Sequence, residues 1–107
     1  MKTITGIYKE PGKPAQTRTI ENDLTALQHL VGGYIKTVTV TSDCVFICNE
    51  EGKLNRMPAN FTFCGEQFVG PVFICGTRGE NFSDLKLSDA AEKRIKACIA
   101  AGDCFGM

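Results

Sequence analysis

The stretch from Asp23 to Lys53 (DLTALQHLVGGYIKTVTVTSDCVFICNEEGK) constrains the fold more than any other part of the chain. Its leucines recur with helical spacing, which predicts a short amphipathic helix that the double glycine Gly32-Gly33 ends. Two strands follow, because 34–40 is rich in β-branched residues and 44–48 is apolar on both faces, as in a central strand. Such a short helix is unstable alone, so it must pack on a sheet.

The flanking segments extend this sheet on both sides. Alternation of apolar and polar residues predicts strands at 3–8 and 15–20, joined by the Pro11-Gly12 turn. A further strand is expected at 67–75, interrupted by Gly70-Pro71, after an irregular loop over 54–66. A polar loop over 76–87 and a helix that starts at Ser88 and ends at Gly102 complete the chain.

The sequence therefore predicts an α+β fold in a single domain over residues 1–107. The expected architecture is a mainly antiparallel sheet of about five strands with two helices packed on it. The order along the chain is β-β-α-β-β-loop-β-α, and the cysteine-rich strand 44–48 lies in the middle.

Charge and hydropathy exclude several classes of protein. Twelve basic and twelve acidic residues cancel, so we do not expect a nucleic-acid partner that is recognised through a basic surface. The N-terminus has no apolar run of signal-peptide length, and no segment approaches the roughly 20 apolar residues of a membrane-spanning helix. We expect a cytoplasmic protein without a membrane partner.

The six cysteines are expected to be reduced packing residues, because most lie inside apolar runs and no secretion signal is present. Cys44 and Cys48 are four apart on a predicted strand, about 13 Å, which is too far for one metal ion. The single histidine, His29, has no spaced nucleophile, and Glu50-Glu51 resembles a solvated acidic turn. We expect no cofactor, no metal and no catalytic residue, so the chain is predicted not to be an enzyme.

The residues left for function are polar groups on the loops and turns around the sheet. An exposed aromatic ring, cationic side chains and amides can hold a nucleotide or a similar anion by stacking and charge-assisted hydrogen bonds. The predicted ligand-binding residues are Tyr34, Asn49, Lys53, Arg56, Asn60, Arg78 and Asn81.

Six segments carry a resemblance to a known family: Glu10–Lys13, Leu24–Ile35, Asn49–Leu54, Pro58–Asn60, Val69–Gly76 and Gly79–Leu85. VGGYI followed by NEEGKL is the most specific pair among them. Over most of its length the chain resembles the domain-of-unknown-function family DUF 3846 of small bacterial and phage proteins. The resemblance implies no assigned activity, and it implies a phage or mobile-element setting inside a bacterial host cell.

Together these observations favour a small non-enzymatic binding protein. The first hypothesis is a phage-type protein that binds and sequesters a small anionic host ligand, such as a nucleotide signal, and so counters host defence. The alternative is a protein–protein interaction module that inhibits or regulates a host or phage protein through an exposed sheet edge or the aromatic stretch Phe61–Phe68. A homodimer or higher oligomer is the expected symmetric assembly.

Overall fold

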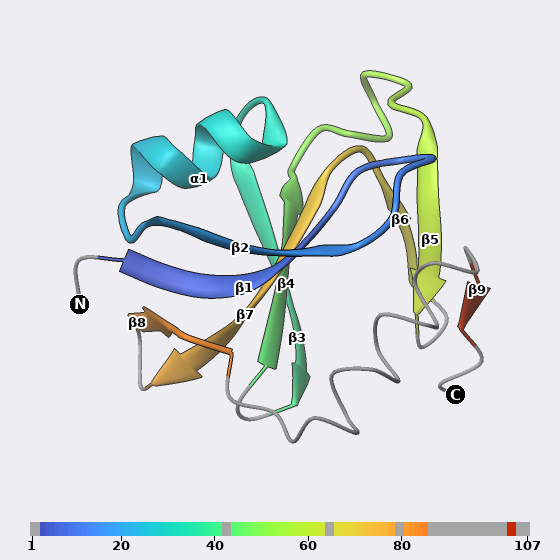
Figure 1. The fold of residues 1–107 in the computed structure, drawn as a ribbon. Coiled ribbons are helices and arrows are strands. Elements are labelled where there is room, and N and C mark those ends of the chain that lie inside the picture. The colour runs from blue at the N-terminus through green and yellow to red at the C-terminus, as the bar shows by residue number, and fades with distance from the viewer. Residues whose placement is uncertain (1–2, 42–43, 64–65, 79–80, 86–102, 105–107) are drawn as a thin grey trace.

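The computed structural model describes residues 3–41, 44–63, 66–78, 81–85 and 103–104, and these form two sheets and a helix (Figure 1). The elements are β1 (Thr3–Lys9), β2 (Gln16–Glu21), α1 (Leu24–Val31), β3 (Ile35–Thr41), β4 (Cys44–Asn49), β5 (Ala59–Phe63), β6 (Glu66–Val69), β7 (Val72–Arg78), β8 (Asn81–Ser83) and β9 (Asp103–Cys104).

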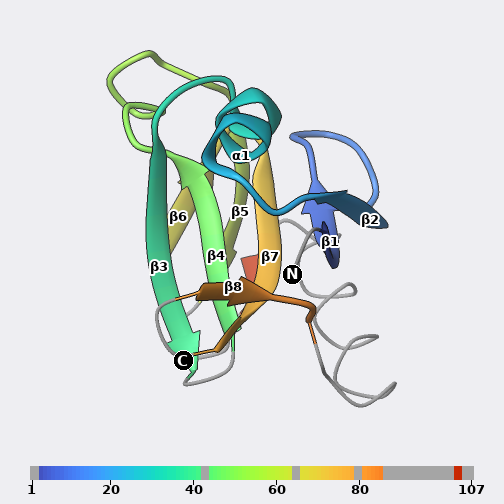
Figure 2. The same ribbon diagram turned by 90° about the vertical axis from the view of Figure 1, so that its left-hand side faces the viewer.

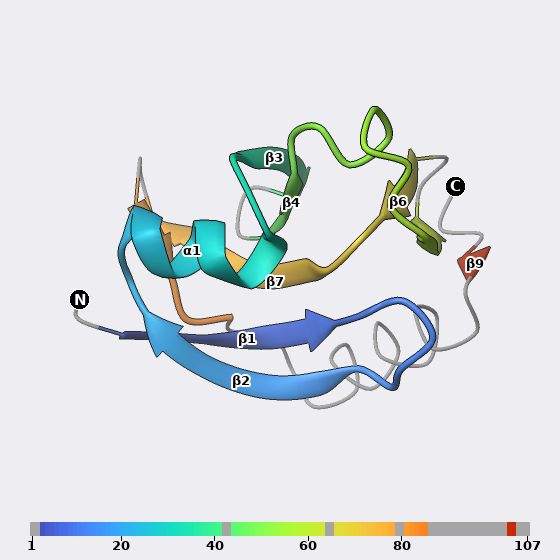
Figure 3. The same cartoon turned by 90° about the horizontal axis from the view of Figure 1, so that it is seen from above.

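The main sheet has the strand order β2-β1-β7-β4-β3, and β8 pairs with β7 beside this path. A small sheet has the order β6-β5-β9. Pairing is antiparallel except between β5 and β9. Helix α1 lies in front of the main sheet in Figure 2, with β5 and β6 behind it. Seen from above in Figure 3, α1 and the β5–β6 hairpin lie at opposite ends of the molecule. Helix α1 therefore covers one face of the main sheet, and the small sheet covers the other.

Each face of the main sheet has its own buried cluster, because side chains alternate along a strand. On β4, Phe46 and Cys48 pack toward the small sheet, whereas Val45 and Ile47 pack toward α1. All six residues of β4 are buried, which confirms the prediction of a central strand that is apolar on both faces. The rings of Phe61 and Phe68 pack on Phe46, with centroid separations of 5.9 and 5.2 Å. Phe61 of β5 and Phe68 of β6, the two ends of the predicted aromatic stretch, thus contribute their rings to the core.

Helix α1 begins and ends as the sequence predicts. Oδ1 of Asp23 accepts a hydrogen bond of 2.7 Å from the backbone N–H of Ala26, which satisfies one free donor of the first turn. Gly32 ends the helix with a φ of +79°, in the left-handed region that glycine adopts without steric cost. Leu27 and Val31 are buried against the sheet, but Leu24 is 57% exposed and does not belong to the apolar stripe.

The predicted fold class, an α+β domain of about five strands and two helices, is wrong. The described residues are mainly β, with nine strands and one eight-residue helix. The segment 54–66 was expected to be an irregular loop, yet β5 and the start of β6 lie there, and β8 lies within the expected loop 76–87. The helix expected from Ser88 to Gly102 lies outside the described residues.

The expected single strand over 67–75 is two strands in different sheets. Gly70 has a φ of +70° and Pro71 has no N–H to donate, so the chain turns here from β6 of the small sheet into β7 of the main sheet. The backbone N–H of Gly70 instead donates to the carbonyl of Pro58 at 2.8 Å, which fixes the turn. This crossover places the small sheet over one face of the main sheet.

Three cysteines of the main sheet, Cys44, Cys48 and Cys75, are buried and form no disulfide, which confirms the prediction of packing thiols for them. Burial raises the pKa of Cys44 from 9.0 to about 11. Burial, with a smaller contribution from the charge of Cys44, raises the pKa of Cys75 to about 12. Neither thiol is a reactive thiolate near neutral pH.

These two thiols predict a loss of stability at alkaline pH. The unfolded chain releases their protons above about pH 9, whereas the folded protein keeps them to about pH 11, so the folded state binds more protons in this window. The unfolding free energy should therefore fall as pH rises from 9 to 11, by an amount on the order of 1 kcal/mol per pH unit for each thiol. Chemical denaturation across this range should show a shallower fall in Cys44→Ala/Cys75→Ala. Parallel curves for the two proteins would contradict this assignment.

Candidate functional site

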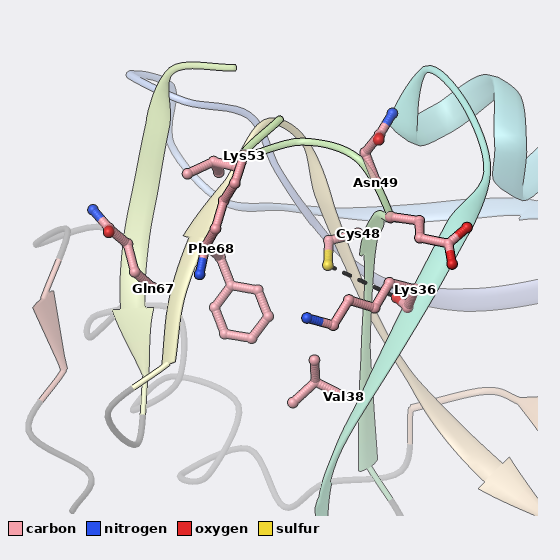
Figure 4. Close-up of a pocket in the computed structure, with 9 residues that line it drawn as sticks. Lys36, Val38, Cys48, Asn49, Lys53, Gln67 and Phe68 are labelled. Atoms are coloured by element: carbon pink, nitrogen blue, oxygen red, sulfur yellow. Dashed lines mark hydrogen bonds between the residues drawn. The ribbon is translucent and has the colours of Figure 1, made fainter. Parts of the chain in front are cut away.

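A narrow groove runs between the edge strand β3 of the main sheet and β6 of the small sheet (Figure 4). It encloses about 60 Å³, less than half of the roughly 150 Å³ cavity that holds a benzene molecule. It therefore has room for one small chemical group. The groove is lined by Lys36, Val38, Cys48, Asn49, Glu50, Lys53, Gln67, Phe68 and Val69.

The groove has an apolar floor and a charged rim. Phe68 and Cys48 are buried at 3% and 7% exposure and belong to the core cluster below the small sheet. Lys36 pairs with Cys48 across β3 and β4, so both side chains lie on the same face of the sheet. In Figure 4 the Lys36 ammonium group points across the groove toward the Phe68 ring. Lys36 is an exposed residue, so its ammonium group lies on the solvent side of this apolar surface.

A second lysine reaches the same groove from the turn after β4. Lys53 is exposed, and its side chain extends toward Phe68 in Figure 4. Glu50 also lines the groove, so two lysines stand against one carboxylate and the net charge there is +1. The groove is suited to an anionic group, although the whole chain is neutral.

A wider pocket of about 240 Å³ adjoins this groove at Asn49. The Tyr34 ring is 66% exposed here, because the chain leaves the left-handed residue Gly32 and runs outward before it enters β3. The pocket exceeds the volume that a benzene ring requires. It is lined by Gln28, Gly32, Gly33, Tyr34, Asn49, Glu51 and Asn55.

Asn49 lines both pockets and links the elements that form them. Its Nδ2 donates to the carbonyl of Val31 at 3.1 Å, and its Oδ1 accepts from the backbone N–H of Glu51 at 2.7 Å. The side chain therefore ties the end of α1 to the turn after β4, and it is only 6% exposed. In Figure 4 it points away from the lysine groove, toward α1. Asn49 positions the site, with one amide N–H donated to α1 and the amide oxygen accepting from the turn after β4.

Asn60, another predicted ligand-binding residue, is a buried structural residue. Its Oδ1 accepts from Nζ of Lys9 at 3.0 Å. Its Nδ2 donates to the carbonyls of Lys9 at 2.9 Å and Gly70 at 2.8 Å. The pair joins β1 of the main sheet to β5 of the small sheet. Burial lowers the pKa of Lys9, whose ammonium group also donates to the carbonyl of Glu10.

The remaining predicted residues do not gather at this end of the sheet. Arg56 is exposed on the turn after β4, with a φ of +55°, and lines neither pocket. Arg78 and Asn81 pair at the β7–β8 turn, and their side chains lie outside the described part of the structure. Their backbone is at the end of β7 remote from Val72, about 20 Å away at the usual strand rise. Of the seven predicted residues, the structure brings together Tyr34, Asn49 and Lys53.

Sequence reasoning missed Lys36, Gln67 and Phe68 as lining residues. Lys36 did give a signal, since it is the one charged residue in the β-branched strand Ile35–Thr41. A charged residue on the face of an edge strand that other elements cover is unusual, so Lys36 could have been chosen from the sequence as a candidate site residue. Phe68 and Gln67 gave no such signal, because they reach the groove only through the packing of β6 against β4.

A broader, open groove lies between β2 and α1. The Arg18 guanidinium lies 4.9 Å from the centroid of the Tyr8 ring, and Tyr8 Oη donates to the carbonyl of Leu30 at 3.3 Å. His29 also lines this groove and is exposed. Within the described residues, no cluster of three or more His, Cys, Asp or Glu side chains could hold a metal ion. Nor does any described helix have the length and apolar character required to cross a membrane.

Comparison with models of known protein families finds a match. The family model described as domain of unknown function DUF3846 matches residues 3–97. No curated protein and no solved structure matches the chain. The matched range includes every residue of the two adjoining pockets.

Proposed function

Because the chain belongs to the DUF3846 family, whose function is unknown, we propose a function from the site alone: a small protein that binds a small anionic ligand. The observation that carries the proposal is the pair of lysines, Lys36 and Lys53, on the rim of the narrow apolar groove. An anionic group that enters this groove leaves bulk water and gains charge-assisted hydrogen bonds in exchange.

In this proposal each of the two pockets binds a different part of the ligand. The 60 Å³ groove takes one anionic group, and the 240 Å³ pocket takes a flat ring that stacks on Tyr34. Glu51 lines the ring pocket, where it repels an anion and accepts hydrogen bonds from ring N–H groups. A phosphate or carboxylate attached to a heterocycle satisfies both halves, and a nucleotide has this construction.

We extend the proposal to sequestration of a host nucleotide signal by a phage-type, anti-defence protein inside the bacterial cell. The phage and mobile-element setting that the family resemblance implies supports this extension. A binder without a catalytic pair suits sequestration, since the ligand needs only to be held.

We expect Lys36→Ala to weaken ligand binding about tenfold, because it removes one charge-assisted hydrogen bond. A panel of mononucleotides, cyclic dinucleotides and ADP-ribose-type nucleotides is screened by thermal shift, and hits are titrated by calorimetry. Mass spectrometry of the heat-denatured, freshly purified protein tests for a retained ligand. Lys13→Ala is the matched control, because Lys13 is exposed on the β1–β2 turn and pairs with Glu10 at 3.1 Å. Equal binding by both variants, or no ligand in either assay, would refute the proposal.

A further inference from the structure

The 240 Å³ ring pocket contains a carboxylate on a fixed backbone. Among the described residues that line this pocket, only Glu51 carries a charge. Its backbone N–H donates to Oδ1 of Asn49 at 2.7 Å, and its carbonyl accepts from the backbone N–H of Asn55 at 2.8 Å. The turn is therefore held on both sides of Glu51, while the side chain itself is exposed and accessible to a ligand.

A carboxylate in this position restricts which ring the pocket can hold. When ionised it has two acceptor oxygens and no proton, so it accepts hydrogen bonds and donates none. It favours a ring edge that has two neighbouring N–H donors, because both oxygens are then used and the ring is held in one orientation. It repels an edge on which the lone pair of a ring nitrogen stands beside a single donor.

Guanine is the common nucleobase with such an edge, since its N1–H and its 2-amino group are adjacent donors. Adenine and cytosine each place an amino group beside a ring nitrogen that accepts, and uracil has one N–H between two carbonyl groups. The amides of Gln28 and Asn55 line the same pocket and can donate to the guanine O6, which is next to N1–H. Stacking on Tyr34 does not discriminate among bases, because every base has a π-face.

We propose that the ring pocket selects guanine and that Glu51 determines this specificity by accepting from N1–H and the 2-amino group. This inference rests on the proposed function, because it takes the ligand to be a nucleotide whose anionic group occupies the lysine groove. The adjacent Glu50 lines the lysine groove and not the ring pocket. The two neighbouring carboxylates thus differ in effect: Glu50 opposes any anion, whereas Glu51 discriminates between bases.

The test is calorimetric titration with guanosine, inosine and adenosine 5′-monophosphates (GMP, IMP and AMP). IMP is GMP without the 2-amino group, so this pair isolates one hydrogen bond to Glu51. We expect GMP to bind at least about tenfold more tightly than IMP or AMP, because each of these loses a hydrogen bond to a charged group. Glu51→Gln replaces one acceptor oxygen with a donor and should reduce the GMP-to-IMP ratio to less than about threefold. Cyclic di-GMP and cyclic di-AMP are compared in the same way.

Two further variants separate this hydrogen bond from a general change in charge. Glu21→Gln removes one carboxylate from an exposed position on β2 that lines neither pocket, and it should keep the preference for GMP. Glu50→Gln should raise the affinity for GMP and IMP together and preserve their ratio. Circular dichroism verifies that each variant is folded.

Equal affinities of the native chain for guanine and adenine nucleotides would overturn the guanine assignment and leave the nucleotide-binding function standing. A GMP-to-IMP ratio that Glu51→Gln does not change would do the same. A native chain that binds none of the five nucleotides would refute the proposed function and this assignment together.

Discussion

Replacing Gly6 with alanine is expected to prevent folding or to cost more than about 3 kcal/mol of stability. A Cβ atom at position 6 would lie 2.1 Å from the carbonyl oxygen of Ile74 and 3.0 Å from the Phe73 ring. The first contact is with backbone of β7, which cannot rotate away as a side chain can. Strand β1 would have to move away from β7, and the pairing of Ile7 with Ile74 would be lost.

Thermal unfolding followed by circular dichroism measures this effect, and the loss should lower Tm by more than about 10 °C. Gly12→Ala is the matched control. Gly12 lies in the β1–β2 turn at a φ of +75° with no atom within 4 Å of an added Cβ. Its substitution costs only the unfavourable backbone conformation, about 1 kcal/mol. Equal losses for the two variants would show that the close approach of β1 and β7 is not the cause.

Asn60→Ala is expected to cost about 3 kcal/mol of stability. The substitution removes three buried hydrogen bonds at once, two donated by Nδ2 and one accepted from Lys9. It leaves the ammonium group of Lys9, which is 4% exposed, with the carbonyl of Glu10 as its acceptor. A buried charge that loses a partner costs more than a neutral group, because its lost solvation is no longer compensated.

Denaturant unfolding of four proteins resolves this contribution: the native chain, Asn60→Ala, Lys9→Met and the double variant. We expect Lys9→Met to cost less than Asn60→Ala, because it removes the charge together with its need for acceptors. The double variant should cost less than the sum of the two single changes. Asn55→Ala, at an exposed asparagine, is the control and should be nearly neutral. Additive losses would mean that Lys9 and Asn60 do not act as a pair.

The pair also explains why one predicted ligand residue was misassigned. Asn60 lies two residues after Pro58 in a segment that was expected to be a loop, and polar loop residues are usually on the surface. Its burial depends on Lys9, which is 51 positions away in the sequence. Nothing local to either residue reveals the contact. The same holds for Asn49, whose amide is committed to the carbonyl of Val31.

Local sequence patterns were sufficient to predict much of the first half of the fold. The Pro11-Gly12 turn, the Asp23 cap, the Gly32 end of α1 and the doubly apolar strand β4 all depend on backbone preferences or on periodicity within a few residues. The exposed ring of Tyr34 was predictable for the same reason, since it directly follows the glycines that end the helix.

The second half could not be derived in this way, because its strands depend on partners distant in sequence. Strands β5 and β6 are short and polar in part, and they are stable only because Phe61 and Phe68 pack on Phe46 of β4. The sequence alone therefore determined where the helix begins and ends, where the chain turns and which segments have the alternating pattern of strands. It also determined that Tyr34 and Lys53 lie on accessible turns. Only the tertiary structure decided that the chain crosses at Gly70-Pro71 into a second sheet, because this depends on which face of β4 remained to be covered. The lysine groove exists because β6 covers β4 but leaves β3 open beside it.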